Sequence, residues 1–336
     1  MFTNKQVTGV IKLTEAHSYT DLISTFLGML IDLELAQNAS YFEIYSATKD
    51  REFGGKNASE ALIRNPLDLS FTATPLGTES DCAQAVEKLE IVKKPGTKKH
   101  KGRYIIPVVG NLRAVGLLMI DDDEQSRDNW EVICAMVDIF GNLLSLIKKK
   151  ERDGLTGLLN RLVFEERLHQ ALHYATVSDR RAGDNPLRFC LALVDVDRFK
   201  SVNDELGHLY GDEVLVHLSQ IMNRSFRYYD LVCRYGGEEF AILLRDVDLA
   251  QAMEVLERFR VTVENYHFPQ VGNKTVSIGV VQVEPGEIMP AIIDKADKAL
   301  YYSKTHGRNQ MHAYEKLVAS GELAPRESKS GDVELF

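Results

Sequence analysis

The chain has 336 residues, of which 44% are hydrophobic and 26% charged, a composition typical of a soluble globular protein with room for two domains. Its net charge of −9 argues against nucleic acid or an anionic membrane as partner, so a phosphate ligand would need a local basic cluster. The four cysteines lack zinc-type spacing, and we find neither a signal sequence nor an apolar run approaching the length of a membrane span. We therefore expect a cytoplasmic protein with reduced thiols.

Residues 1–128 predict a first domain. Residues 18–35 carry apolar side chains at helical spacing, and residues 41–47 alternate as a strand does. Two apolar runs, Arg103–Val109 and Arg113–Asp121, flank a short Gly-Asn turn and predict an antiparallel hairpin. This order of elements, with PVVGNLRAVGLLMID as its late hairpin, resembles a GAF-type sensory domain, and a PAS-like sensor is the alternative. The resemblance implies a sensor ligand, whose identity the sequence does not reveal.

Residues 129–152 predict a connecting helix. Its apolar residues recur at spacings of three and four, as the a and d positions of a coiled coil do: Trp130, Ile133, Val137, Phe140, Leu144 and Ile147. Such a stripe must be buried, either against its own domain or against a twin helix in a parallel dimer. We expect a coiled-coil connector that carries rotation or register changes from sensor to output.

Residues 153–316 alternate between strands and helices. The predicted helices are Arg161–Ala175, Asp212–Phe226, Leu249–Tyr266 and about Met289–His306, and the predicted strands include Arg188–Asp197 and Val276–Val283. Helices interleaved with a mostly antiparallel sheet indicate an α+β domain of the nucleotidyl-cyclase and polymerase-palm type. The polar, proline-bearing residues 317–336 predict a disordered tail.

The stretch RYGGEEF predicts a hairpin tip that carries candidate metal-binding side chains. Gly236 and Gly237 supply the positive φ that a tight turn requires, and Glu238 and Glu239 follow directly. Asp195 closes the predicted central strand, so two acids from neighbouring strands could hold Mg²⁺ on a triphosphate. The simpler alternative is a solvated hairpin, with Asp195 as a turn or cap residue.

Lys304 and Arg308 lie four residues apart at the end of the last predicted helix. On one side of that helix they could meet phosphate oxygens. The alternative is the common enrichment of cations at helix C-termini, with Gly307 ending the helix.

Five segments together resemble the GGDEF diguanylate cyclase family, in its GGEEF variant. They are DGLTGLLNR (153–161), DVDRFKSVND (195–204), GHLYGDEVL (207–215), RYGGEEF (234–240) and KADKALYYSKTHGRN (295–309). The resemblance implies that two GTP molecules condense to cyclic di-GMP with release of two pyrophosphates. Because each half-site holds one GTP, it also implies a working homodimer.

The resemblance assigns roles to individual residues. Asp195, the carbonyl of Val196 and Glu238 correspond to ligands of Mg²⁺, with Mn²⁺ as the alternative ion, and Glu239 to a base for the attacking 3′-hydroxyl. Asn203 and Asp212 correspond to the guanine readers, although Asp212 could also cap the helix that it begins. The same pocket is lined by Phe199, Lys200, His208, Lys304 and Arg308.

Arg227 and Asp230 match the family's RxxD site, where the product cyclic di-GMP binds as an inhibitor, and Arg258 is a candidate for a secondary contact. The alternative is a local surface ion pair. Two other functions are compatible with the same sequence: a catalytically silent cyclic di-GMP receptor, and a scaffold that senses GTP without turnover.

Overall fold

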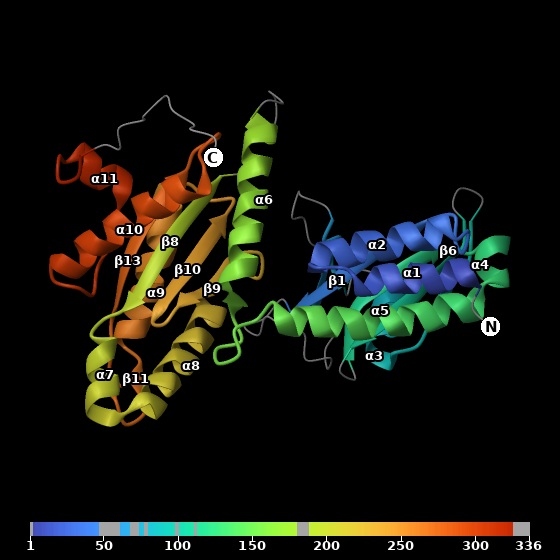
Figure 1. Ribbon diagram of the computed structural model, residues 1–336, viewed down its shortest axis with the longest axis horizontal. Coiled ribbons are helices and arrows are strands. Elements are labelled where there is room, and N and C mark those ends of the chain that lie inside the picture. Colours follow the sequence, from blue (N-terminus) through green and yellow to red (C-terminus); the bar gives the residue numbers. More distant parts are fainter. Residues whose placement is uncertain are drawn as a thin grey trace. The chain divides into compact units, whose positions relative to one another are not determined.

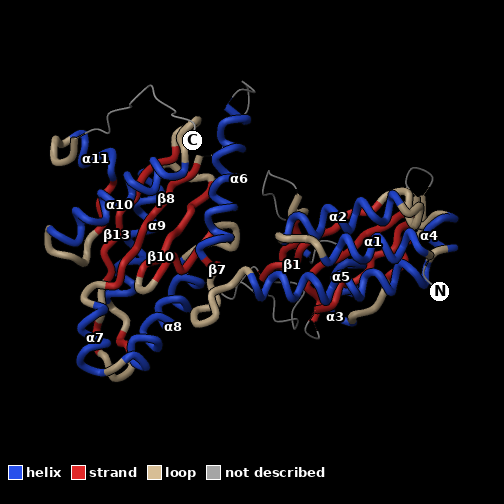
Figure 2. The backbone as a smooth tube through the Cα atoms, viewed as in Figure 1, coloured by secondary structure: helices blue, strands red, loops and turns tan. Residues whose placement is uncertain are grey.

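The computed structural model describes residues 3–46, 61–67, 74–76, 80–97, 101–110, 113–179 and 188–324. The chain forms two compact units (Figures 1 and 2). The N-terminal unit comprises residues 1–152 with residues 227–229, and the C-terminal unit comprises residues 153–226 and 230–336. The end of the predicted disordered tail, residues 325–336, lies outside the described residues.

An antiparallel sheet organises the N-terminal unit. In the described part of this unit it has six strands in the order β3-β2-β1-β6-β5-β4. The strands are β1 (Ala39–Ser46), β2 (Ala61–Arg64), β3 (Thr74–Pro75), β4 (Val92–Lys94), β5 (Arg103–Gly110) and β6 (Arg113–Asp121). The predicted hairpin is confirmed as β5 and β6, and its turn, residues 111–112, lies outside the described residues.

Helices cover both faces of this sheet. One face packs against α1, α2 and α5, which Figure 1 shows side by side, and the other packs against α3. The helices are α1 (Asn4–Thr14), α2 (Tyr19–Asp32), α3 (Ser80–Lys88), the short α4 (Glu124–Asp128) and α5 (Trp130–Lys150). The predicted helix over residues 18–35 is confirmed as α2, whose N-cap is Ser18.

The coiled-coil prediction for α5 is wrong. Its seam residues Ile133, Val137, Phe140 and Leu144 are at most 4% exposed because they form part of the hydrophobic core of the N-terminal unit. Phe140 stacks on Phe26 of α2, with ring centroids 4.1 Å apart. A spacing of three and four is required equally by a helix that packs on its own sheet, so periodicity alone could not separate the two alternatives.

The C-terminal end of α5 is anchored in the same unit. Lys148 forms an ion pair with Glu43 of β1 at 2.8 Å, and the buried carboxylate of Glu151 accepts a hydrogen bond from the backbone N–H of Tyr19. By length and composition alone, α5 is the one helix of the described chain that could cross a membrane, contrary to our reading of the sequence. Its apolar seam lies instead in the core.

The main sheet of the C-terminal unit has the order β14-β13-β8-β10-β9-β7 within the described residues. Its strands are β7 (Leu159–Asn160), β8 (Phe189–Val196), β9 (Leu231–Gly236), β10 (Glu239–Arg245), β13 (Val276–Val283) and β14 (Met311–Ala313). The inner strands β13, β8, β10 and β9 pair antiparallel, whereas the edge strands β14 and β7 pair parallel to their neighbours. The short strands β11 (His267–Phe268) and β12 (Gly272–Asn273) form a separate ribbon.

The central strand β8 is buried on both faces, as its apolar sequence predicts. Cys190, Ala192 and Val194 contribute to the core beneath α8 and α9, and Phe189, Leu191 and Leu193 to the core beneath α6, α10 and α11. These helices are α6 (Arg161–Asp179), α8 (His208–Ser225), α9 (Leu249–Glu264), α10 (Met289–Thr305) and α11 (Tyr314–Ala319), with α7 (Phe199–Leu206) preceding α8. By this alternation Asp195, at the end of β8, shares the face that α10 covers.

Two predicted boundaries need correction. Helix α8 begins at His208, four residues before Asp212, because Gly207 with φ of 94° separates α7 from α8. The predicted disordered tail is ordered at its start: Leu317 is 4% exposed, and α11 packs on the sheet. The polar composition of this segment favoured disorder as the prediction, although a few apolar side chains are enough to pack α11 on the sheet.

Candidate active site

Three carboxylates lie close together at one end of the C-terminal sheet, where β8 finishes and β10 begins. Asp195, 6% exposed, is the last residue but one of β8 and lies opposite Glu239, the first residue of β10, in the antiparallel register. Glu238 occupies the turn between β9 and β10, half-buried, while Glu239 is exposed. The structure thus brings together the three acids singled out in the sequence.

The turn itself depends on one glycine and one arginine. Gly237 has φ of 52°, whereas Gly236 lies in strand β9 without a positive φ, so the expectation of two left-handed glycines is wrong. The Nε of Arg234 donates to the carbonyl of Gly237 at 3.0 Å, and its terminal nitrogen forms an ion pair with Asp153 at 3.3 Å. Arg234 therefore braces the turn that carries Glu238.

Asp153, the other partner of Arg234, is held in its ionised form. Burial alone would raise the pKa of its carboxyl, but hydrogen bonds from Thr156 and the charge of Arg234 outweigh burial and lower that pKa. Sequence reasoning gave neither Arg234 nor Asp153 a role. The sequence signal that could have identified these two residues is that each is a charged residue next to an apolar strand.

Asp195 has an unusual electrostatic environment. Burial raises the pKa of its carboxyl to about 6, although the ammonium group of Lys304, 2.6 Å away, favours the charged form. The negative charges of Glu238 and Glu239 raise the pKa further. A buried carboxylate crowded by two others is stabilised by any cation that binds beside it.

The donor set suits a hard divalent cation. No group of three or more His, Cys, Asp or Glu side chains with metal-binding geometry occurs in the part of the chain that the structure describes. Two carboxylates, Asp195 and Glu238, with the carbonyl of Val196 are nevertheless the kind of partial oxygen shell that Mg²⁺ accepts, because it keeps several waters and takes the rest from phosphates. Asp195 already lies beside one positive group, the ammonium of Lys304 at 2.6 Å.

Helices α7 and α8 place the predicted nucleotide-binding residues. Phe199 is buried at the start of α7, and Asn203 one turn later faces Gly211 of α8, where a Cβ would lie 2.0 Å from the side-chain oxygen of Asn203. Asp212 is exposed in the second turn of α8, so the alternative that it caps this helix is wrong. Lys200 and His208 are exposed at the first turns of α7 and α8.

The two predicted phosphate ligands differ in position. Lys304, in the last turn of α10, contacts Asp195. Arg308 lies three residues beyond the helix, exposed, with φ of 63° and its backbone N–H donating to the carbonyl of Ser303 at 3.0 Å. Only Lys304 is therefore seen in contact with the carboxylates of the site.

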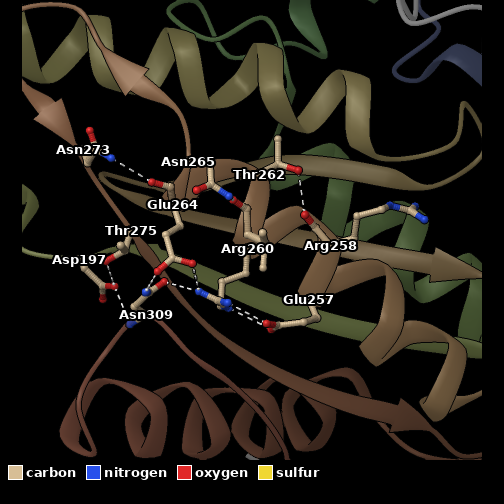
Figure 3. A network of polar contacts seen from close by, with 11 residues as sticks. Asp197, Glu257, Arg258, Arg260, Thr262, Glu264, Asn265, Asn273, Thr275 and Asn309 are labelled. Carbon is tan, nitrogen blue, oxygen red and sulfur yellow. Dashed lines mark hydrogen bonds and ion pairs between the residues drawn. The ribbon is translucent and has the colours of Figure 1, made fainter.

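The structure shows contacts for two residues of the predicted inhibitory site, Arg227 and Asp230. Arg227 is exposed and donates a hydrogen bond to the hydroxyl of Tyr229 at 2.7 Å. Asp230 is buried, and its carboxylate accepts the backbone N–H of Arg245 at 3.2 Å. Arg258 is exposed on α9 (Figure 3). Substitution of Asp230 would therefore disturb the strands as well as any ligand.

Comparison with known families matches residues 150–310 to the model described as diguanylate cyclase, GGDEF domain. Diguanylate cyclase A of Treponema denticola is 31% identical over 220 residues, which cover 62% of this chain and 58% of that protein. Diguanylate cyclase DgcM of Escherichia coli K12 is 39% identical over 163 residues, 48% of this chain and 38% of that protein. The chain thus spans less than two thirds of either relative.

Among solved structures, the coiled coil and GGDEF domain of DgcB from Caulobacter crescentus, in complex with c-di-GMP, aligns with a TM-score of 0.49 and 28% identity. The alignment covers 57% of this chain and all of that one.

Proposed function

We propose that this protein condenses two GTP molecules into cyclic di-GMP and two pyrophosphates, because residues 150–310 match the family model described as diguanylate cyclase, GGDEF domain. The observation that carries the proposal is Asp195, a buried carboxylate at the end of the central strand, with Lys304 at 2.6 Å and the Glu238 turn beside it. This arrangement can hold a cation against phosphates, which a solvated hairpin has no need to do.

In the proposed reaction the 3′-oxygen of each GTP bonds to the α-phosphorus of the other, so the same step occurs twice and closes the ring. The bond from that phosphorus to the bridging oxygen of pyrophosphate breaks, and Glu239 takes the hydroxyl proton. Asp195, Glu238 and the carbonyl of Val196 would hold Mg²⁺, which neutralises phosphate charge when bound. Lys304 and Arg308 add positive charge, and Asn203 and Asp212 orient the guanine, supported by Phe199, Lys200 and His208.

The reaction needs two copies of the domain that face each other, so we propose a homodimer as the working form. The buried seam of α5 is not available for this contact, because it belongs to the core of the N-terminal unit. The dimer must therefore use other surfaces.

We propose that the N-terminal unit is a sensor of the GAF or PAS type. Its antiparallel sheet, with helices on both faces and α5 leading toward residue 153, supports this reading. We also propose product inhibition at Arg227 and Asp230, with Arg258 as a secondary contact. Arg227 is the better residue for testing it, because Asp230 also holds β10 through the N–H of Arg245.

The proposal is tested by incubating the full chain with GTP and Mg²⁺ and quantifying cyclic di-GMP over time by chromatography. We expect product from the wild-type protein, none from Glu238→Ala, and a longer linear phase from Arg227→Ala, which lacks the inhibitory contact. Glu254→Ala, which removes an exposed carboxylate from α9, is the matched control and should behave as wild type. Nucleotide binding without product in all four proteins would favour the GTP-sensing scaffold, and binding of cyclic di-GMP alone the silent receptor.

Gly211→Ala should raise the KM for GTP about tenfold with a smaller effect on kcat. The new methyl group would lie 2.0 Å from the side-chain oxygen of Asn203, so this flexible side chain must withdraw from the guanine pocket and lose a hydrogen bond. Alanine is a better helix former than glycine, so thermal stability should hold. Gly28→Ala in α2, where nothing lies within 4 Å, is the control. An unchanged KM would remove Asn203 from guanine recognition.

A further inference from the structure

Asp197 lies two residues beyond Asp195 and makes quite different contacts. It is 5% exposed, and its carboxylate accepts hydrogen bonds from the hydroxyls of Thr275 and Ser277, both at 2.6 Å. A third bond comes from the backbone N–H of Asn309 at 2.9 Å (Figure 3). Three donors take up most of the accepting capacity of a carboxylate, so Asp197 is engaged with protein groups rather than with a cation.

The side chain of Asn309 is held by two residues of α9. Its amide nitrogen donates to Glu264 at 2.7 Å, and its amide oxygen accepts from Arg260 at 2.5 Å (Figure 3). Arg260, with a side chain 11% exposed, is itself fixed by ion pairs to Glu257 and Glu264 on α9. Asn309 is therefore clamped between the end of β8 and helix α9.

This clamp holds a strained piece of backbone. Arg308 and Asn309 have φ of 63° and 46°, which places two consecutive non-glycine residues in the left-handed region. Such a conformation is unfavourable for a residue with a Cβ and persists only where surrounding contacts enforce it. Here the contacts on either side are the bond from Arg308 N–H to Ser303 and the Asn309 clamp. The direction in which the Arg308 side chain leaves the backbone is thereby fixed.

We propose that Asp197 is a positioning residue which, through Asn309, sets Arg308 for contact with the phosphates of GTP. This inference rests on the proposed function for the identity of the ligand. The network orders Arg308 before the nucleotide arrives, so binding does not have to supply the ordering free energy. Asp197 touches neither substrate nor metal in this role, and its effect must therefore pass through Arg308.

A double-mutant cycle on the full chain tests that dependence. The variants are Asp197→Asn, Arg308→Ala and the double variant, and the readouts are kcat/KM and the Kd of the non-reactive analogue α,β-methylene-GTP with Mg²⁺. Asparagine keeps the shape of Asp197 but replaces one accepting oxygen by an NH₂ group and removes the charge. We expect Arg308→Ala to weaken analogue binding about thirtyfold and Asp197→Asn about tenfold, because hydrogen bonds to charged groups are lost. The double variant should match Arg308→Ala alone.

Two further variants guard against a purely structural effect. Asn309→Gly keeps the left-handed backbone but removes the side-chain clamp, and should show the same non-additivity with Arg308→Ala even if Asp197→Asn folds poorly. Asn265→Ala removes a side chain whose amide donates to the carbonyl of Val261 on its own helix, and should leave the Kd unchanged. Thermal unfolding of each variant reports its folded fraction.

Additive effects of Asp197→Asn and Arg308→Ala on analogue affinity, or a loss that only follows the folded fraction, would overturn the inference. Coupled effects on affinity in a protein that makes no cyclic di-GMP would overturn the proposed function and leave the role of Asp197 standing. The two failures are therefore distinguishable.

Discussion

Asp195→Asn should lower cyclic di-GMP synthesis by the order of 10³-fold while making the metal-free protein more resistant to unfolding. The loss follows because the substitution removes a buried negative charge that, in the proposed reaction, holds the cation against the phosphates. The gain in stability follows because burial disfavours the ionised form of this carboxyl group. Burial raises its pKa to about 6 despite the ion pair with Lys304. Function at this position thus opposes stability.

The pH dependence of the stability gain has a definite sign. A carboxyl whose pKa is higher in the folded than in the unfolded state destabilises the fold when ionised, so the penalty exists above about pH 6 and fades as the pH falls toward 4. The midpoint of urea unfolding should therefore be higher in Asp195→Asn than in wild type at pH 8, with the difference shrinking at pH 4.5. Asp294→Asn, a partly exposed carboxylate paired with Lys298 on α10, is the matched control. A variant less stable than wild type at pH 8 would contradict the argument.

Gly279→Ala should destabilise the C-terminal unit by about 3 kcal/mol or more. A Cβ at this position in β13 would lie 2.1 Å from the backbone nitrogen of Leu300 and 2.2 Å from the carbonyl oxygen of Ala296. Both are backbone atoms of α10, so no side-chain rotation relieves the clash, and the helix carrying Lys304 must move away from the sheet.

The measurement is urea unfolding followed by probes in each unit, since two units need not unfold in one transition. We expect the transition of the C-terminal unit to shift and that of the N-terminal unit to stay. Gly154→Ala, where nothing lies within 4 Å and φ is not positive, should shift neither. An unchanged transition in Gly279→Ala would mean that β13 and α10 tolerate a wider separation.

Much of the C-terminal unit was predictable because the apolar pattern of each element reflects which of its faces are buried. Strand β8 is apolar at successive positions because both of its faces are buried, and the predicted strand over Val276–Val283 has the same bounds as β13. Helices α9 and α10 were located to within two residues by their periodicity. In the N-terminal unit, α1 was missed although Thr3 and Gln6 form a capping box at its start.

What failed depends on contacts that a local pattern cannot contain. The stripe of α5 predicts burial but not the burying partner, which proved to be the sheet and α2 of the same unit. The bond between Asp197 and Asn309 joins residues 112 positions apart, so neither residue suggests the other. The three carboxylates were found because Asp195 closes a predicted strand and Glu238 and Glu239 directly follow the Gly-Gly turn, and the resemblance then assigned them roles.

A helix whose stripe is built into a core moves in steps, because packed interiors hold a few discrete arrangements rather than a continuum. Helix α5 ends at Lys150, and three residues later Asp153 holds Arg234, which in turn holds the carbonyl of Gly237. A repacking around Phe140 would thus act on a helix that ends three residues before Asp153, which is two contacts away from the turn that carries Glu238. Under the proposed sensor function, substitutions at Phe140 should therefore change the fraction of molecules in the active arrangement rather than the rate at which each active molecule works.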